Sequence, residues 1–470
     1  MERGLSAREK RLRGSEAIFP RRAKRPMGSA VEPQWGRKYW SCRECENNIP
    51  FFLLCANSSL DSHAGGDGEV HQFNPCVLSL FLQFQIDAHA LTYGDGFSGS
   101  HKLKKSLCHF LNRRFRPRIA LCPSHLTITS GVSNAVECCA WALADPGDHV
   151  LVGRPYFNAF KTIFGARPRV ELQEVKFGKT DPFSMAALQH YERAYAEAKN
   201  NDVRVKALLL CSPHNPLGRC YSEEVLREYM RFCSRNGLHL ISDEIYALSV
   251  WDNPHLPDAT PFRSVLSINF EEVIDPSTVH VVWGLSKVRI HIPLTDMNID
   301  DFGATGLRIG CLISQSNTLL LDAAEGISLY NFPSSLADNI ATSLLLDDKF
   351  TSEYIATNRK RLAGSYRFAT KFLRSHQIPY VECNAAFFIW INLGAVAKDR
   401  TSSDKDILAR LHKERVYIAT GAIYASEEPG WFRMVFAHPQ NVLEEGLNRM
   451  LRAIQSRQCL IQEADVAHLT

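Results

Sequence analysis

The chain has 470 residues, of which 45% are hydrophobic and 22% charged, a composition typical of a folded globular protein with more than one lobe. The formal net charge of +4 at pH 7 is small for this length and gives no reason to expect a nucleic-acid partner. The strongest membrane candidate, "PCVLSLFLQFQIDAHAL", is interrupted by Gln83, Gln85 and Asp87, so we expect no membrane segment.

The fourteen cysteines have no regular spacing, and we read no signal peptide before them. This pattern favours reduced, mostly buried thiols in a cytoplasmic protein. The single Cys-x-x-Cys motif, Cys42 with Cys45, has no second pair at zinc-finger spacing, so we expect no metal site there.

In chain order, the first predicted element is a disordered basic tail over residues 1–34, in which Lys and Arg far outnumber Glu. An organelle-targeting segment is the weaker alternative, because acidic residues are present and no amphipathic face is clear. Residues 35–90 are predicted to form an N-terminal segment that contributes to a smaller domain.

A larger α/β domain is predicted over residues 91–348, because short apolar runs alternate with helical patterns from about residue 121. Ligands of parallel sheets bind beyond the carboxyl ends of the strands. Four of the apolar runs end in unusual polar clusters, which we therefore expect to converge on one crevice: "SGVSNAVECC", "CSPHNPLG", "DEIY" and "GLSK".

Each cluster has a chemical and a purely structural interpretation. The helix predicted to begin near Ser133 can bind a phosphate at its N-terminus, or Ser133 can simply cap it. Asp243 can hold a heteroaromatic nitrogen protonated, while Tyr246 and Asn215 can hydrogen-bond an oxyanion; surface turns are the alternative. Lys287 follows a buried strand, where desolvation would lower its pKa toward that of a nucleophilic amine, although most such lysines are simply solvated.

Beyond residue 349 the pattern changes to a long helix, the alternating stretch "AAFFIWINL", the strand "WFRMVFA" and a last helix. We predict a smaller α+β domain over residues 349–460 and a tail over residues 461–470. Arg433 lies within the second of these strands and needs an anionic partner there.

Taken together, the ordered motifs resemble the class I/II aminotransferases, which are fold-type-I enzymes dependent on pyridoxal 5′-phosphate, and within them the branch similar to 1-aminocyclopropane-1-carboxylate synthase. The resemblance extends from about residue 91 to residue 455. It implies an α/β fold with a mostly parallel seven-stranded sheet flanked by helices, plus a smaller α+β domain.

The resemblance also implies roles for individual residues. Lys287 would form the internal aldimine and move the α-proton, and Asp243 would pair with the pyridine nitrogen. Tyr246 and Asn215 would hydrogen-bond the phenolic oxygen of the cofactor. The remaining implied cofactor contacts are Gly131, Val132, Ser133, Phe157, Ser286 and Arg308.

For substrate binding, the resemblance implies that Arg433 grips the α-carboxylate of an amino acid or keto acid. The stretch "CENNI" is the nearest match to an N-terminal substrate motif and nominates Glu46 and Asn47. Tyr93 matches a tyrosine that such enzymes lend to the neighbouring site, which implies a homodimer with shared active sites.

One departure from the family pattern separates the lysine from the phosphate-binding arginine. Lys287 and Arg308 are 21 residues apart, and removing residues 288–300 restores the spacing of eight that the family shows. The insertion is either a protruding loop, at small cost in chain entropy, or translated non-coding sequence. Its exposed apolar residues and its lack of turn signals favour the second interpretation.

Four functions compete. We favour a PLP-dependent aminotransferase, with a cyclopropane-forming or other PLP-dependent lyase as the alternative, because both begin by removing the proton at Cα. A third possibility is a pseudo-enzyme disabled by the insertion. An effector domain joined to a DNA-binding helix pair fits poorly, because the residues before Tyr93 show no such pair.

Overall fold

The computed structural model describes residues 88–287, 304–398 and 403–456, and these residues belong to one compact unit. Several predictions of the sequence analysis lie outside the described residues. They are the basic tail 1–34, nearly all of the 35–90 segment with Glu46 and Asn47, the insertion 288–300, and the tail 461–470.

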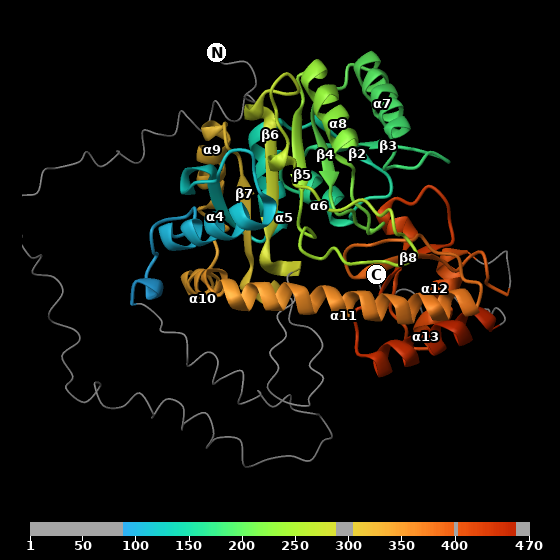
Figure 1. The fold of residues 1–470 in the computed structure, drawn as a ribbon. Helices are drawn as coiled ribbons and strands as arrows, with labels where there is room; N and C mark the ends of the chain where they lie inside the picture. Colours follow the sequence, from blue (N-terminus) through green and yellow to red (C-terminus); the bar gives the residue numbers. More distant parts are fainter. Residues whose placement is uncertain (1–87, 288–303, 399–402, 457–470) are drawn as a thin grey trace, which may run out of the picture. The chain divides into compact units, whose positions relative to one another are not determined.

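A seven-stranded sheet forms the centre of the larger lobe, with strand order β1-β7-β6-β5-β4-β2-β3 (Figure 1). β7 runs antiparallel to both of its neighbours, whereas the other adjacent strands are parallel, so the prediction of a mostly parallel α/β sheet is confirmed. The strands are β1 Leu126–Ser130, β2 His149–Gly153, β3 Glu171–Val175, β4 Val205–Cys211, β5 His239–Asp243, β6 Val279–Gly284 and β7 Ile309–Ile313.

Helices cover both faces of this sheet, which explains why its strands read as continuous apolar runs. Within β4, Leu208 and Leu210 pack on one face, while Leu209 and Cys211 pack on the other. The first face is covered by α4 His101–Phe115, α7 Leu188–Asn200, α8 Glu223–Asn236 and α10 Ser335–Leu346. The second face is covered by α5 Val132–Leu143, α6 Ala159–Gly165 and α9 Thr318–Ser328.

Local signals fix where these helices begin and end. α8 starts after Ser222, whose hydroxyl accepts a hydrogen bond from the Val225 N–H, and it stops at Gly237 in the left-handed conformation, with φ +64°. α5 begins at Val132, one residue before the predicted start, because Gly131 with φ +76° forms its N-cap.

A three-stranded antiparallel sheet, ordered β8-β10-β9, follows in the chain. One face packs Ile389, Ile391, Phe432 and Met434 into a separate apolar core, and the opposite face carries Arg433. The sheet and the helices around it are β8 Phe388–Asn392, β9 Ala419–Thr420, β10 Trp431–Val435, α11 Asp348–Ser375, α12 Asp404–Lys413 and α13 Gln440–Gln455. In Figure 1, the long α11 runs from beside α10 to the vicinity of α12 and α13.

Short 3-10 helices connect these elements. They are η2 Ala88–Leu91, η3 Pro123–His125, η4 Met185–Ala187, η5 Val265–Ser267, η6 Pro276–Thr278, η7 Leu285–Lys287, η8 Ala304–Leu307 and η9 Gly421–Tyr424. Among the described residues, no helix combines the length and the apolar character needed to cross a membrane. The described cysteines are all free, and all but Cys122 are buried.

Candidate active site

The four polar clusters meet at one cavity of about 140 Å³. β4, β5 and β6 are parallel neighbours, so their carboxyl ends lie side by side and deliver the clusters that follow them to one edge of the sheet. The residues that line the cavity are Val132, Ser133, Val136, Phe157, Phe160, Ile163, Cys211, Asn215, Asp243, Ile245, Tyr246, Ser286, Lys287, Thr305 and Arg308.

Lys287 enters the cavity from η7, directly after β6. Its Nζ lies 6.0 Å from the ring centroid of Tyr246 and 5.4 Å from that of Phe387. Burial lowers the pKa of the amine, and the charge of Arg433 lowers it further, against the opposing effect of Asp243. The neutral, nucleophilic form is therefore more populated than for a solvated lysine.

Asp243 ends β5 and is only 3% exposed. Its Oδ1 accepts a hydrogen bond from the Ile245 N–H at 3.1 Å, and no ion pair reaches it from the described cations. Burial raises the pKa of this carboxyl to about 7, although the Ile245 N–H and Lys287 lower it in part. A dry carboxyl without a counter-ion is suited to a ligand atom that carries a proton.

Tyr246 and Asn215 are both buried beside this carboxyl. Burial raises the pKa of the Tyr246 phenol, so the phenol keeps its proton and can donate a hydrogen bond at neutral pH. Asn215 uses its Oδ1 to accept a hydrogen bond from Arg433 Nη1 at 3.2 Å. That contact connects the larger sheet to β10 of the smaller one.

Arg433 is held over aromatic rings, with its Cζ 4.9 Å from the ring centroids of both Phe388 and Tyr424. Its Nε is buried and has no hydrogen-bond partner in the described part of the chain. Arg433 is half-buried, and a buried donor left unused is costly unless an anion binds it, so this side chain is suited to a carboxylate ligand.

Arg308 lies at the other end of the cavity, beside the N-terminus of α5. Its Nη2 donates to the Ser130 carbonyl at 3.2 Å, and its Nη1 lies 3.2 Å from the Thr305 carbonyl and 3.5 Å from Ser286 Oγ. A Cβ on Gly131 would lie 2.2 Å from Nη2, so a larger residue would displace the guanidinium, and the φ of +76° favours glycine independently. An arginine beside a helix N-terminus is suited to a phosphate.

Lys287 and Arg308 line the same cavity although they are 21 residues apart in the sequence. η7 and η8, which flank the undescribed residues 288–303, pack against each other. The described residues on either side of 288–303 are therefore close together, as one ligand shared by Lys287 and Arg308 requires.

A model of the family "Aminotransferase class I and II" matches residues 74–450, which is most of the chain. The chain belongs to this family. Among curated relatives of this aminotransferase, the probable aminotransferase aclI of Aspergillus oryzae is 34% identical over 369 residues, covering 78% of this chain and 83% of the relative. The 1-aminocyclopropane-1-carboxylate synthase-like protein 1 of Mus musculus is 29% identical over 391 residues, covering 82% of this chain and 73% of the relative.

Solved structures agree on the fold. The aromatic aminotransferase from Pyrococcus horikoshii has a TM-score of 0.66 at 21% identity, over 85% of this chain and 97% of that one. The expected fold type I is therefore confirmed, as is membership in the branch similar to 1-aminocyclopropane-1-carboxylate synthase. The chain is a pyridoxal-phosphate-dependent aminotransferase by family.

The residues in the cavity fit this cofactor. Asp243 is a buried carboxyl that lacks a counter-ion and could face a protonated ring nitrogen. The Arg308 guanidinium lies against Gly131 and lines the cavity together with Ser133 and Ser286, a set of donors suited to a phosphate. Lys287 supplies an amine of lowered pKa within the same cavity.

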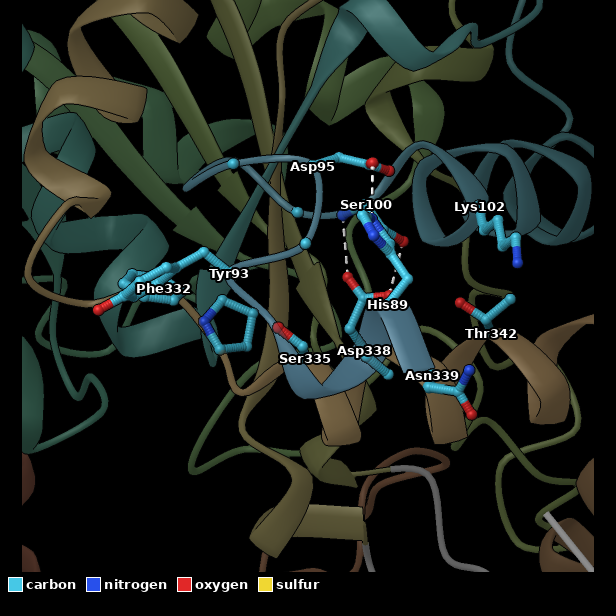
Figure 2. Close-up of a pocket in the computed structure, with 15 residues that line it drawn as sticks. His89, Tyr93, Asp95, Ser100, Lys102, Phe332, Ser335, Asp338, Asn339 and Thr342 are labelled. Carbon is cyan, nitrogen blue, oxygen red and sulfur yellow. Dashed lines mark hydrogen bonds and ion pairs between the residues drawn. The ribbon is translucent and has the colours of Figure 1, made fainter. Parts of the chain in front are cut away.

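Most of the predicted site residues line this cavity, and Gly131 and Arg433 are in contact with residues that do. Phe157, which the resemblance nominates, lines the cavity, whereas the hydroxyl of the adjacent Tyr156 donates to Glu174 at 2.7 Å. Tyr93 does not line it. Tyr93 lies in a separate pocket with Phe332 and Asp338, as Figure 2 shows.

Sequence reasoning missed several residues that shape the site. Phe387 and Tyr424 come from the smaller lobe, and their single aromatic letters gave no chemical signal. Thr305 and Ile163 reach the cavity only through the fold. The repeated aromatic letters of "NAAFFIW" are the only hint that the sequence offers.

Proposed function

We propose that this aminotransferase transfers the amino group of an amino acid to a keto acid, with Lys287 as the catalytic amine. The observation that carries the proposal is the meeting of Lys287, Asp243 and Arg308 in one cavity, with Arg433 adjacent. When bound, pyridoxal phosphate withdraws electrons from the substrate Cα. Asp243 would hold its ring nitrogen, and Arg308, Ser286 and the N-terminus of α5 would hold its phosphate.

Other residues of the site would orient the substrate, move its α-proton and hydrogen-bond the cofactor. Arg433 orients the substrate by pairing its guanidinium with the α-carboxylate, in a dry aromatic setting that strengthens the interaction. Lys287, freed as a neutral amine, takes the proton from Cα and can return it at a neighbouring atom. Tyr246 and Asn215 would hydrogen-bond the phenolic oxygen of the cofactor.

Two further proposals concern assembly and location. We propose a homodimer, because large apolar side chains are exposed along the segments that form the pocket of Figure 2: Leu91 at 72%, Tyr93 at 79% and Tyr330 at 83%. In that view Tyr93 and Phe332 lie on one side of the pocket, with Lys102 and Thr342 on the other. A cytoplasmic location is proposed because the described cysteines form no disulfide.

The test of the catalytic amine is Lys287→Ala. Borohydride reduction of the wild-type protein with pyridoxal phosphate, followed by peptide mass spectrometry, is expected to find the cofactor fixed to Lys287. The variant is expected to lose this adduct and to lose activity by at least about 10²–10⁴-fold, the contribution of a general base.

Lys104→Ala is the matched control, because burial also lowers the pKa of Lys104, yet this lysine lies outside the cavity and donates to Ser98 Oγ at 3.0 Å. A stable adduct in Lys287→Ala would refute the assignment. The wild-type protein, assayed with a panel of amino acids with and without a keto acid, distinguishes transamination from the lyase reaction. Transamination needs the acceptor, whereas the lyase alternative forms product without it.

A further inference from the structure

Glu244 shares the turn that carries Asp243 and Tyr246 but makes contacts of its own. The side chain is fully buried, and its Oε1 accepts hydrogen bonds from the Val265 N–H at 2.9 Å and from the Ser242 hydroxyl at 3.1 Å. These contacts connect the end of β5 to the first residue of η5.

The backbone of the same residue holds the turn on its other side. The Glu244 N–H donates to the Val282 carbonyl of β6 at 3.0 Å, and the Glu244 carbonyl accepts from the Ala247 N–H at 3.0 Å. The turn is thus held by β6 through the main chain and by η5 through the carboxyl. No other side chain in the described part of the turn spans to η5 by a hydrogen bond.

The second oxygen of the Glu244 carboxyl, Oε2, differs from Oε1 in its contacts. Oε2 is buried and has no hydrogen-bond partner of good geometry in the described part of the chain, although the Ser264 hydroxyl is nearby. The charged group that acts on the carboxyl is Asp243, and the other groups around it are hydroxyls and backbone N–H groups. Burial raises the pKa of Glu244 to about 8, so the carboxyl is mostly neutral at pH 7.

We propose that Glu244 is a positioning residue for this site: as a neutral acid it holds the turn that carries Asp243 and Tyr246 against η5, and its ionisation loosens that turn. A carboxylate with an unpaired buried oxygen must gain hydration, which the closed turn does not supply. A second negative charge next to Asp243 also opposes an anionic ligand. The proposal rests on the proposed function, because it takes Asp243 and Tyr246 as cofactor contacts.

The test measures the dissociation constant for pyridoxal phosphate, by absorbance titration of the cofactor-free protein, from about pH 7 to about pH 9. Each pH unit above the pKa of a group whose ionisation opposes binding weakens affinity by up to about tenfold. The ionisations of Asp243 and Lys287 are common to the wild type and to Glu244→Gln, so the difference between the two curves isolates Glu244. Glu244→Gln keeps the shape but cannot ionise, so over this range the wild type is expected to weaken by about tenfold more than the variant.

Two further variants sharpen the comparison. Asp338→Asn removes another buried carboxyl, one that accepts hydrogen bonds from Ser100 outside the cavity, and it is expected to follow the wild-type curve. Glu244→Ala removes the contact with Val265 and is expected to weaken binding at every pH. Parallel curves for wild type and Glu244→Gln, or undiminished binding by Glu244→Ala, overturn the role of Glu244. A wild type that binds no pyridoxal phosphate overturns the proposed function instead.

Discussion

Single residues in this site are held in states that they would not adopt in water. Asp243 is a buried carboxyl with a raised pKa, and Lys287 is an amine with a lowered one. Arg433 keeps an unused buried donor. Each state costs stability in the free protein and suits a ligand of the complementary charge, which is typical of functional sites.

The free-energy cost of burying the ionised Asp243 carboxylate predicts that the stability of the fold depends on pH. The pKa of Asp243 is about 7 in the folded protein, against an ordinary value of 3.8, so between these two pH values the unfolded chain has lost a proton that the folded chain keeps. The folded state therefore loses stability as pH rises through this range. Without cofactor, wild type is expected to lose about 3 kcal/mol more than Asp243→Asn between about pH 5 and about pH 8.

Urea unfolding at the two pH values measures this difference. The exposed Asp202→Asn, made at a position where the backbone has φ +58° and asparagine fits as well, is the control and is expected to follow the wild type. Identical pH profiles for wild type and Asp243→Asn would contradict the burial of an uncompensated carboxyl.

At the scale of elements, the site depends on β4, β5 and β6 ending together and on η7 packing against η8. The insertion lies between those two short helices, and its own residues are outside the described part of the chain. Since η7 and η8 already meet, the short connection left after its removal has little distance to span.

Deleting residues 288–300 is expected to leave pyridoxal phosphate affinity no weaker than in the full chain. Shortening the connection from 21 to 8 residues should raise the free energy of unfolding by only about 1 kcal/mol, at about 0.6 kcal/mol per doubling of length. Replacing the same thirteen residues by a Gly/Ser linker keeps the length as a control. Loss of binding in both variants would show that the insertion contributes to the site.

At the scale of the whole molecule, Tyr93 is exposed on a segment away from the cavity that contains Lys287. A tyrosine in that position can serve catalysis only if a second copy brings it to its neighbour's site. The proposed homodimer therefore predicts complementation between two variants that are each inactive.

Lys287→Ala and Tyr93→Ala copies, carrying different tags and co-expressed, are expected to regain about a quarter of wild-type activity, because half of the dimers are mixed and each has one intact site. Purification through both tags should raise this to about one half. Mixed dimers that remain inactive, from copies that fold and dimerise, would contradict sharing of Tyr93.

The order of the motifs, the α/β class and the chemistry of the clusters that carry Asn215, Asp243, Tyr246 and Lys287 can all be read from the sequence. These features are readable because an apolar run followed by a polar cluster marks the end of a strand, and a pattern of neighbouring residues is enough to recognise it. The resemblance alone nominates Phe157, and the fold supplies the physical reason: the Phe157 side chain lines the cavity, whereas the hydroxyl of the adjacent Tyr156 donates to Glu174.

The tertiary structure also decided what distant segments contribute. Phe387 approaches Lys287 because the smaller sheet packs beside the larger one, and Tyr424 approaches Arg433 because η9 packs against β10. No local pattern encodes either relation. It brought Lys287 and Arg308 to one cavity across 21 residues, because η7 and η8 pack together whatever the length of chain between them. Burial, which sets the charge of Asp243 and Glu244, likewise arises only when the sheets and helices close around them.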